Sequence, residues 1–141
     1  APTERTFYMT GFEYKGSTTT DSLAAPEQDP SKLSDGYRYK APGHDEASPN
    51  KWEVSTYRFE PGEMMGYQGD TFNLIMFYIN GDKHTVWVEA PDGSEASAPA
   101  EMNRGREYKI TFTADQAGVY AVHCDEHDPS MTAYVLVLPR P

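Results

Sequence analysis

The sequence contains a single cysteine, Cys124, in 141 residues. One thiol cannot form a disulfide bond within the chain, so the usual sign of an oxidising compartment is missing. A lone cysteine on an apolar strand is ordinarily a buried core residue. The residues around Cys124 decide whether it has another role.

Long apolar runs and basic charge are also scarce. No stretch approaches the roughly 20 apolar residues that a membrane helix requires, so we expect no membrane span. The chain has 12 basic and 22 acidic residues, for a formal net charge of −10. This charge repels polyanions, so nucleic acid is not an expected partner. It would favour encounter with a basic protein, although many soluble proteins are acidic for solubility alone.

Aromatic and β-branched residues are abundant, and helical periodicity with caps is missing. Aromatics make up 13% of the chain, which favours pleated, half-buried strands. Short runs between turn signals predict seven or eight strands, which is typical of an all-β sandwich or barrel. The runs span residues 6–14, 52–59, 71–80, 84–90, 106–114, 118–124 and 132–138.

We predict one domain over residues 1–141, because the chain has the length of one ordinary domain and is short for two domains that each have a core. Residues 17–50 carry four prolines and no sustained apolar period, and we interpret them as a long insertion. The tyrosines of residues 35–40 could anchor this insertion on the body of the fold. The chain starts without Met, as it would after removal of a signal peptide or tag. This start is compatible with export but does not show it. We expect a periplasmic or otherwise extracytoplasmic protein.

The segment GVYAVHCDEHDPSMTAYVLV brings three metal-binding side chains together. A strand ends at Cys124, a polar loop carries His127 and Met131, and another strand follows. A thiolate, an imidazole and a thioether suit copper, because soft sulfur stabilises Cu(I) and imidazole serves both oxidation states. The sequence therefore predicts a copper site on this loop.

A trigonal copper site needs a second imidazole, and three histidines remain to supply it. His123 adjoins Cys124 on a strand, so its side chain should point to the opposite face. His44 lies in the irregular insertion, where a solvated histidine is expected. His84 begins a strand directly after a turn. It is therefore expected at the end of a sheet, as is the loop that follows Cys124. We therefore choose His84.

These residues resemble the cupredoxin family over roughly the last two thirds of the chain. The amino half is similar in YRFEPGEMMGYQGDTFNLIMFYINGDKHTVWVEAPDG, and the carboxyl half in GREYKITFTADQAGVYAVHCDEHDPSMTAYVLV. The resemblance implies a Greek-key β-sandwich of about eight strands with one copper ion at one end. It implies copper ligands at His84, Cys124, His127 and Met131. It also implies single-electron transfer, with His127 near the surface as the electron exit.

The same resemblance predicts an electron carrier that is not an enzyme. Expected partners are redox proteins such as a c-type cytochrome or a terminal oxidoreductase, and the insertion could build an oligomer contact. The chain departs from the family in placing Met131 four residues after His127, rather than five or three. The segment Phe7-Tyr8-Met9-Thr10 and the pattern that follows it also resemble the cupredoxin domains of nitrous oxide reductase and oxidase subunit II. Their binuclear copper sites need two cysteines, which excludes such a site within one chain.

Several alternatives stay open at this point. A red-copper protein similar to nitrosocyanin would replace Met131 with a carboxylate and leave an open position for catalysis or sensing. Glu60, Glu63 or Glu89 could supply the carboxylate. A copper oxidase or nitrite reductase would need a further copper site built largely from histidines, and few histidines remain. A copper chaperone would favour a surface rich in methionine or cysteine. A cysteine hydrolase is disfavoured because nothing marks an oxyanion hole or an orienting acid.

Overall fold

The computed structural model describes residues 1–19, 21, 47 and 49–141. Most of the predicted insertion at residues 17–50, including His44 and the tyrosines of residues 35–40, lies outside the described residues. The chain forms two compact units, one of residues 1–14 and 56–141 and the other of residues 15–55. The prediction of one domain over the whole chain stays a prediction.

Nine strands account for nearly all the regular structure that is described, and the all-β prediction is confirmed. They are β1 (Glu4–Thr19), β2 (Lys51–Glu60), β3 (Glu63–Tyr67), β4 (Thr71–Tyr78), β5 (Lys83–Glu89), β6 (Glu95–Asn103), β7 (Glu107–Thr113), β8 (Gly118–Cys124) and β9 (Thr132–Leu138). One 3₁₀ turn, η3 (Asp125–His127), joins β8 to β9. No described helix has the length and apolar character needed to cross a membrane.

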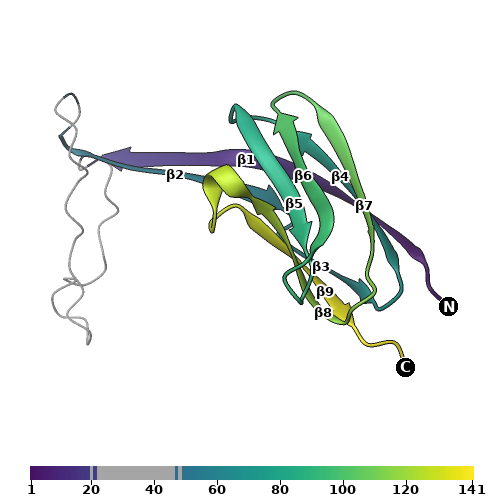
Figure 1. Ribbon diagram of the computed structural model, residues 1–141. Coiled ribbons are helices and arrows are strands. Elements are labelled where there is room, and N and C mark those ends of the chain that lie inside the picture. Colours follow the sequence, from purple (N-terminus) through teal and green to yellow (C-terminus); the bar gives the residue numbers. More distant parts are fainter. Residues whose placement is uncertain (20, 22–46, 48) are drawn as a thin grey trace, which may run out of the picture. The chain divides into compact units, whose positions relative to one another are not determined.

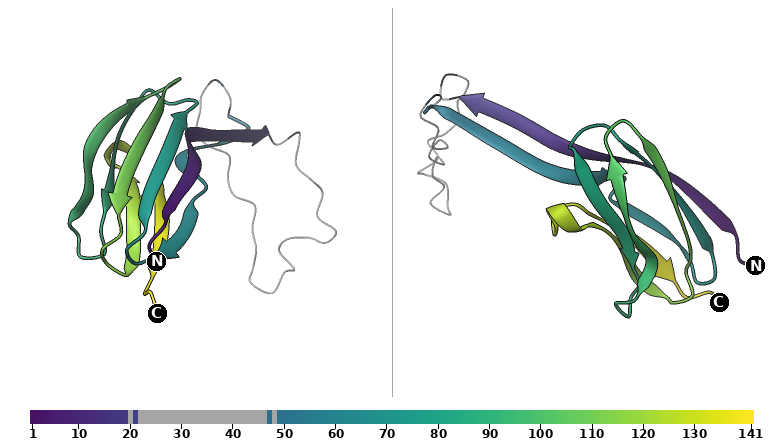
Figure 2. Two further views of the ribbon diagram at one scale, coloured as in Figure 1. Left: turned by 90° about the vertical axis from the view of Figure 1, so that its right-hand side faces the viewer. Right: turned by 45° about the horizontal axis from the view of Figure 1, so that its top comes forward.

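The strands form two sheets that pack face to face as a sandwich (Figures 1 and 2). One sheet has the order β2-β1-β4-β7 and the other the order β3-β9-β8-β5-β6. Strands β1 and β4 are parallel, as are β3 and β9, while β4–β7, β5–β6, β5–β8 and β8–β9 are antiparallel. The core between the sheets contains buried side chains from both of them.

Alternation of side chains explains why each strand lies where it does. In β8 the inward residues Tyr120, Val122 and Cys124 are buried, while the residues between them are at least partly exposed. Strand β4 lies between β1 and β7 and is the most completely buried strand, as its nearly continuous apolar run predicts. The period of two therefore turns Cys124 into the sandwich and His123 away from it.

Strand β6 was not predicted from the sequence. Its segment EASAPAEMN contains Pro99 and small or acidic residues, and most of it is exposed. It lies at the edge of its sheet, where one side of the backbone needs no partner. Proline is tolerated in such an edge strand, which is why the usual strand signals fail there.

The two ends of the sandwich carry different features. Both termini lie at one end, and η3 lies at the opposite end (Figure 1). At the terminal end, fully buried Asp70 accepts hydrogen bonds from the backbone N–H groups of Thr3 (3.0 Å) and Tyr67 (2.9 Å). Asp70 also pairs with Arg5 and Arg140. It therefore joins the first and last segments of the chain to the turn between β3 and β4.

Candidate metal centre

The loop from Cys124 to Met131 is closed by two main-chain hydrogen bonds. The N–H of Cys124 donates to the carbonyl of Met131 (3.1 Å), and the N–H of Met131 donates to the carbonyl of His127 (3.0 Å). Cys124 is the last residue of β8, and His127 is the last residue of η3. The local fold therefore fixes the backbone of all three residues that the sequence singled out on this loop.

His84 reaches the same place from β5, the neighbour of β8 in the sheet. The antiparallel register pairs Val86 with Cys124, so the inward-facing His84 lies two residues beyond this pair. Its side chain is fully buried, whereas His127 is only partly buried. The topology thus brings residues 40 positions apart in the sequence to one end of the sandwich.

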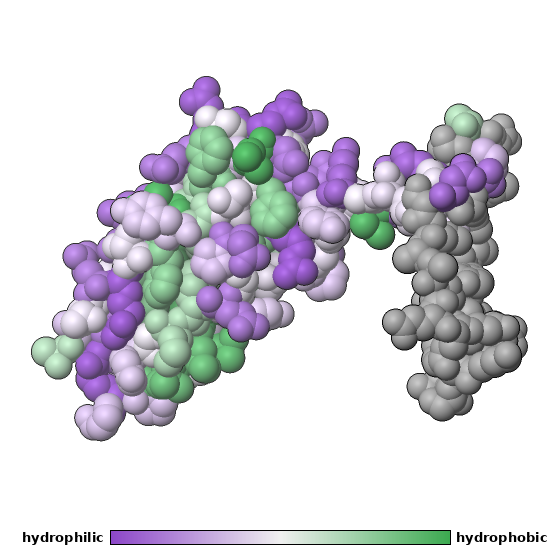
Figure 3. Space-filling model, turned by 180° about the vertical axis from the view of Figure 1, so that it is seen from behind, coloured by the Kyte–Doolittle hydropathy of each residue, from purple (hydrophilic) through white to green (hydrophobic). Residues whose placement is uncertain are grey.

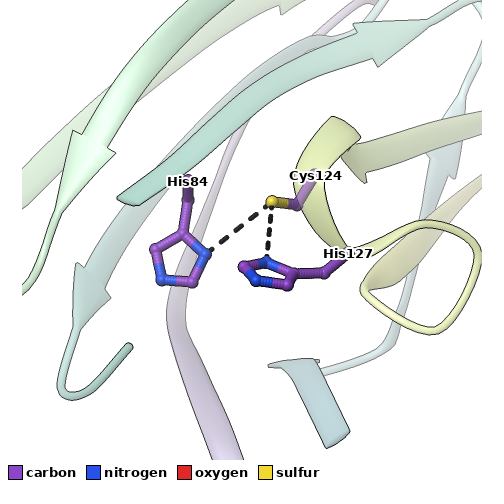
Figure 4. Close-up of side chains that lie close together, drawn as sticks. All are labelled: His84, Cys124 and His127. Atoms are coloured by element: carbon purple, nitrogen blue, oxygen red, sulfur yellow. Dashed lines mark hydrogen bonds between the residues drawn. The ribbon is translucent and has the colours of Figure 1, made fainter. Parts of the chain in front are cut away.

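The side chains of His84, Cys124 and His127 point toward one another (Figure 4). The Sγ atom of Cys124 lies 3.3 Å from Nδ1 of His127 and 3.7 Å from Nδ1 of His84. The donor atoms of the three residues all lie within 4.8 Å of one another. Among the residues that the structure describes, this is the one group of histidine, cysteine and carboxylate side chains with metal-binding spacing.

The donor set fits a single metal ion. With bond lengths of about 2.3 Å to sulfur and 2.0 Å to nitrogen, as found for zinc, a trigonal or tetrahedral ion separates sulfur from nitrogen by about 3.5 to 3.7 Å. The observed separation of 3.7 Å lies in this range, and that of 3.3 Å lies about 0.2 Å below it. A metal at Nδ1 would also place a proton on Nε2 of His84, which is buried and has no hydrogen-bond partner of good geometry. One thiolate and two imidazoles suit copper.

Burial opposes charge on these groups when no metal is bound. Burial raises the pKa of the Cys124 thiol to about 11, although backbone hydrogen bonds near the sulfur act in the opposite direction. Burial also lowers the pKa of His84, an effect that the Asn80 carbonyl partly offsets. At neutral pH the site therefore holds a thiol and a neutral His84 imidazole. A metal ion must displace the thiol proton on binding.

Aromatic rings surround the two histidines. The ring of Tyr78, from the end of β4, stacks on His84 with centroids 4.9 Å apart. The ring of Tyr57, from β2, stacks on His127 with centroids only 3.5 Å apart and planes inclined by 10°. The hydroxyl of Tyr78 donates to the sulfur of Met102 at 2.9 Å, which satisfies this buried group. Neither tyrosine was singled out from the sequence.

Met131 is fully buried at the start of the segment leading into β9. Its methyl group lies beside Gly11, where an added Cβ would come within 3.3 Å of it and within 2.4 Å of the Tyr78 ring. The side chain therefore lies inside the sandwich, and its backbone is bonded to Cys124 and His127. Its role as the axial ligand stays a prediction.

His123 points away from the candidate site, as the alternation of the strand predicts. Its Nε2 atom lies 2.6 Å from a carboxylate oxygen of Glu89, and its Nδ1 atom lies 3.3 Å from Asp128. Its ring stacks on Trp87, with centroids 5.1 Å apart. Glu89 is thus engaged on the outer face of the sheet. It is not grouped with the three donors, and neither are Glu60 and Glu63.

From the sequence, Glu126 is either solvated loop charge, like Asp125 and Asp128, or a carboxylate that flanks the copper and lowers its reduction potential. Its two oxygens accept hydrogen bonds of 2.6 Å from the N–H and hydroxyl of Thr85. The Cys124 thiol lies 3.5 Å from one of these oxygens. Burial raises the pKa of Glu126, but the Thr85 hydrogen bonds outweigh it and the net shift is downward. A negative charge therefore lies beside the sulfur.

The fold is shared with solved copper proteins of the cupredoxin class. The chain is similar to a Cu-containing nitrite reductase from Thermus scotoductus, with 15% identity, 98% of this chain and 28% of that chain covered, and a TM-score of 0.60. It is also similar to a multi-copper oxidase from Pseudomonas thermotolerans, with 12% identity, 100% and 31% coverage, and a TM-score of 0.57. The cupredoxin-like β-sandwich predicted from the sequence is therefore confirmed.

The other comparisons are less informative. A reduced Cu(I) form of an amicyanin mutant is 31% identical over 57% of this chain and 72% of that chain, with a TM-score of 0.42. No protein-family model matches the chain, and the search of curated proteins found no match. The more specific resemblances to nitrosocyanin, nitrous oxide reductase and oxidase subunit II are not confirmed.

The expectation that the chain is not an enzyme is contradicted. Solved structures that match nearly its whole length include copper enzymes, a nitrite reductase and a multi-copper oxidase. The chain spans only 28% and 31% of their lengths. The expectation rested on the resemblance to electron-carrying cupredoxins, and the small number of histidines argued only against a second copper site within this chain. A catalytic copper site can draw on a further domain or chain. One sandwich fold can carry both electron carriers and enzymes, because function depends on the sites built on it.

Proposed function

We propose that the chain holds one copper ion through His84, Cys124, His127 and, as a weak axial ligand, Met131, and transfers single electrons. When bound, copper supplies the Cu(I)/Cu(II) couple. The observation that carries the proposal is the convergence of one sulfur and two imidazole nitrogens within 4.8 Å of one another at one end of a cupredoxin-like sandwich.

The protein contributes a nearly fixed arrangement of these donors. The closed loop fixes Cys124 and His127, and the strand register fixes His84. Burial of Cys124 and His84 excludes water, which would otherwise reorganise each time the charge of the site changed. A rigid, dry donor set suits both oxidation states and favours fast electron transfer. His127 is partly exposed and would provide the route to a partner.

Addition of Cu(II) to the metal-free protein tests this function directly. We expect one equivalent of copper to bind and to produce an intense visible absorption band from thiolate-to-copper charge transfer. The electron paramagnetic resonance spectrum should show one Cu(II) environment with sulfur coordination. Binding without such a band, or several weak and unsaturated binding events, would contradict the proposal.

A second candidate function follows from the likeness to copper enzymes. The same copper site would then relay electrons to a catalytic site in another domain or chain. Among the described residues, His123 is the one histidine left outside the proposed centre, so this chain would need histidines from elsewhere for a second copper site. Stopped-flow reoxidation of the reduced protein by nitrite or dioxygen would reveal catalysis within this chain. Reoxidation that requires a second protein would indicate a relay.

The partner of the proposed carrier would be basic. Asp125, Glu126 and Asp128 lie on the loop that carries His127, and the chain as a whole has a charge of −10. A c-type cytochrome or a terminal oxidoreductase with a positive docking face fits this charge, and association should weaken as salt screens it. We propose an extracytoplasmic location, where such partners meet small copper proteins.

The Glu126 carboxylate should lower the reduction potential of the copper. It lies 3.5 Å from the Cys124 sulfur, and a negative charge there favours Cu(II) over Cu(I). We expect Glu126→Gln to raise the potential measured by voltammetry, with the visible band retained. Glu95→Gln, at the opposite end of the β5–β6 hairpin, is the matched control and should leave the potential unchanged. A potential that does not rise in Glu126→Gln would contradict this role.

A further inference from the structure

Tyr57 makes the closest ring contact of the candidate metal centre. Its ring lies almost parallel to the His127 imidazole, with centroids 3.5 Å apart. It also meets His84 edge-on, with centroids 6.0 Å apart and planes inclined by 65°. The same aromatic side chain thus contacts both imidazoles of the donor set. It comes from β2, in the sheet opposite the one that carries the three donors.

The surrounding residues fit this position of Tyr57 closely. Tyr57 and Phe59 alternate with exposed Arg58 and Glu60 along β2, and Phe59 is anchored in the core with only 1% of its surface exposed. Gly81 lies against the rings of Tyr57 and His84, with a φ angle of +78°. An added Cβ there would come within 3.0 Å of the Tyr57 ring and 2.9 Å of Nε2 of His84. Only glycine therefore leaves room for the two rings to pack at this point.

We propose that Tyr57 is a positioning residue for the copper site, which holds the His127 ring in its ligating orientation and shields it from water. The inference rests on the proposed function. His127 is the more exposed of the two histidine ligands, so it is the one whose ring orientation the protein must fix from outside. Its other described ring neighbour is His84, at 5.2 Å and a tilted angle, which provides no parallel face.

Two physical consequences follow for the loaded protein. A flat, apolar ring face against the imidazole keeps water from one side of the site, and loss of that cover stabilises the more highly charged Cu(II). Loss of Tyr57 should therefore lower the reduction potential. The freed His127 ring should also sample several orientations, which broadens the paramagnetic resonance of Cu(II). Phenylalanine offers the same ring face, so Tyr57→Phe should retain the properties of the original protein.

The test compares Tyr57→Ala, Tyr57→Leu and Tyr57→Phe with Tyr8→Ala, which removes a tyrosine that is 75% exposed. In the metal-free protein, nuclear magnetic resonance should show His127 ring protons shifted upfield by the Tyr57 ring current. That shift should disappear in the alanine and leucine variants and remain in Tyr57→Phe and Tyr8→Ala. In the copper-loaded proteins, voltammetry should give a lower potential for the alanine and leucine variants alone. Tyr57→Leu keeps most of the apolar volume if Tyr57→Ala fails to fold.

The possible results distinguish a failure of this inference from a failure of the proposed copper function. A normal thiolate-to-copper band with the same potential in Tyr57→Leu and the unmodified protein overturns the positioning role and leaves the copper function standing. Absence of the band in the unmodified protein overturns the copper function, and the role of Tyr57 with it. A potential lowered equally in Tyr57→Phe also overturns the inference, because it would assign the effect to the hydroxyl and not to the stacked ring.

Discussion

Replacing Cys124 with alanine is expected to abolish the thiolate-to-copper band completely. The thiolate is the one sulfur anion that this chain can offer, and the two imidazoles left behind form a weaker site of a different geometry. Because changes in residues that merely support metal ligands cost about 10- to 100-fold in affinity, loss of the ligand itself should cost more than about 100-fold. Competition with a copper chelator measures the affinity, and absorption measures the band.

The adjacent residue supplies the control for this prediction. His123 belongs to the same strand but points outward, where it pairs with Glu89 and Asp128. We expect His123→Ala to keep the band and the copper stoichiometry. Cys124 is fully buried and small, so its replacement by alanine should leave the sandwich folded. Survival of the band in Cys124→Ala would overturn the proposed centre.

Replacing Asp70 with asparagine is expected to lower the thermal stability of the protein strongly without changing the copper spectrum. Asp70 is fully buried between Arg5 and Arg140, and it accepts the backbone N–H groups of Thr3 and Tyr67. The amide of asparagine is neutral and turns one acceptor into a donor that faces a guanidinium group. We expect the melting temperature to fall by about 5 °C or more.

The same ion pairs predict how this stability depends on pH. The hydrogen bond from Arg5, followed by that from Thr3, holds the pKa of Asp70 far below its ordinary range. In the unfolded chain the pKa of this carboxyl group is about 4. A group with a depressed pKa stabilises the folded state above the unfolded value, and this stabilisation is lost as the pH falls below about 4.

Urea unfolding at several pH values checks this dependence. The difference between the unmodified protein and Asp70→Asn should be full at pH 7 and should shrink below about pH 4. Asp82→Asn serves as the control, because the Asp82 side chain is 90% exposed and its ion pair with Arg104 lies at the surface, where such pairs contribute little to stability. A difference that is constant from neutral to strongly acidic pH would show that the charge of Asp70 is not the cause.

The fold was largely predictable because most strands have a recognisable local sequence pattern. Strand β5 alternates buried residues with at least partly exposed ones along its whole length, and β4 shows the apolar run of a central strand. The short β3 and the edge strand β6 escaped prediction. Their positions depend on pairing with β9 and β5, which no local pattern encodes. Long-range pairing therefore set the limit on what the sequence alone could reveal.

The candidate site shows the same limit. Cys124 and His127 could be predicted as neighbours because both lie on one short loop. His84 could be chosen because it begins a strand directly after a turn. The structure brings these three together. Glu126 was predictable only as one of two possibilities, solvated charge or a carboxylate beside the copper, because the hydrogen bonds to Thr85 that hold it depend on the fold. Tyr57 was not predictable, since its role arises from a contact with the opposite sheet.

Both termini lie at the end opposite η3, which determines how the protein is oriented when it is attached to an electrode through a terminus (Figure 1). Strand β4, which runs along the sandwich from Thr71 to Tyr78, is about 25 Å long. A linker joined to either terminus therefore holds the copper end roughly one sandwich length from the anchor. On an electrode tethered through its last residue, the protein should exchange electrons slowly. The apolar surface seen in Figure 3 offers a different orientation on a hydrophobic electrode.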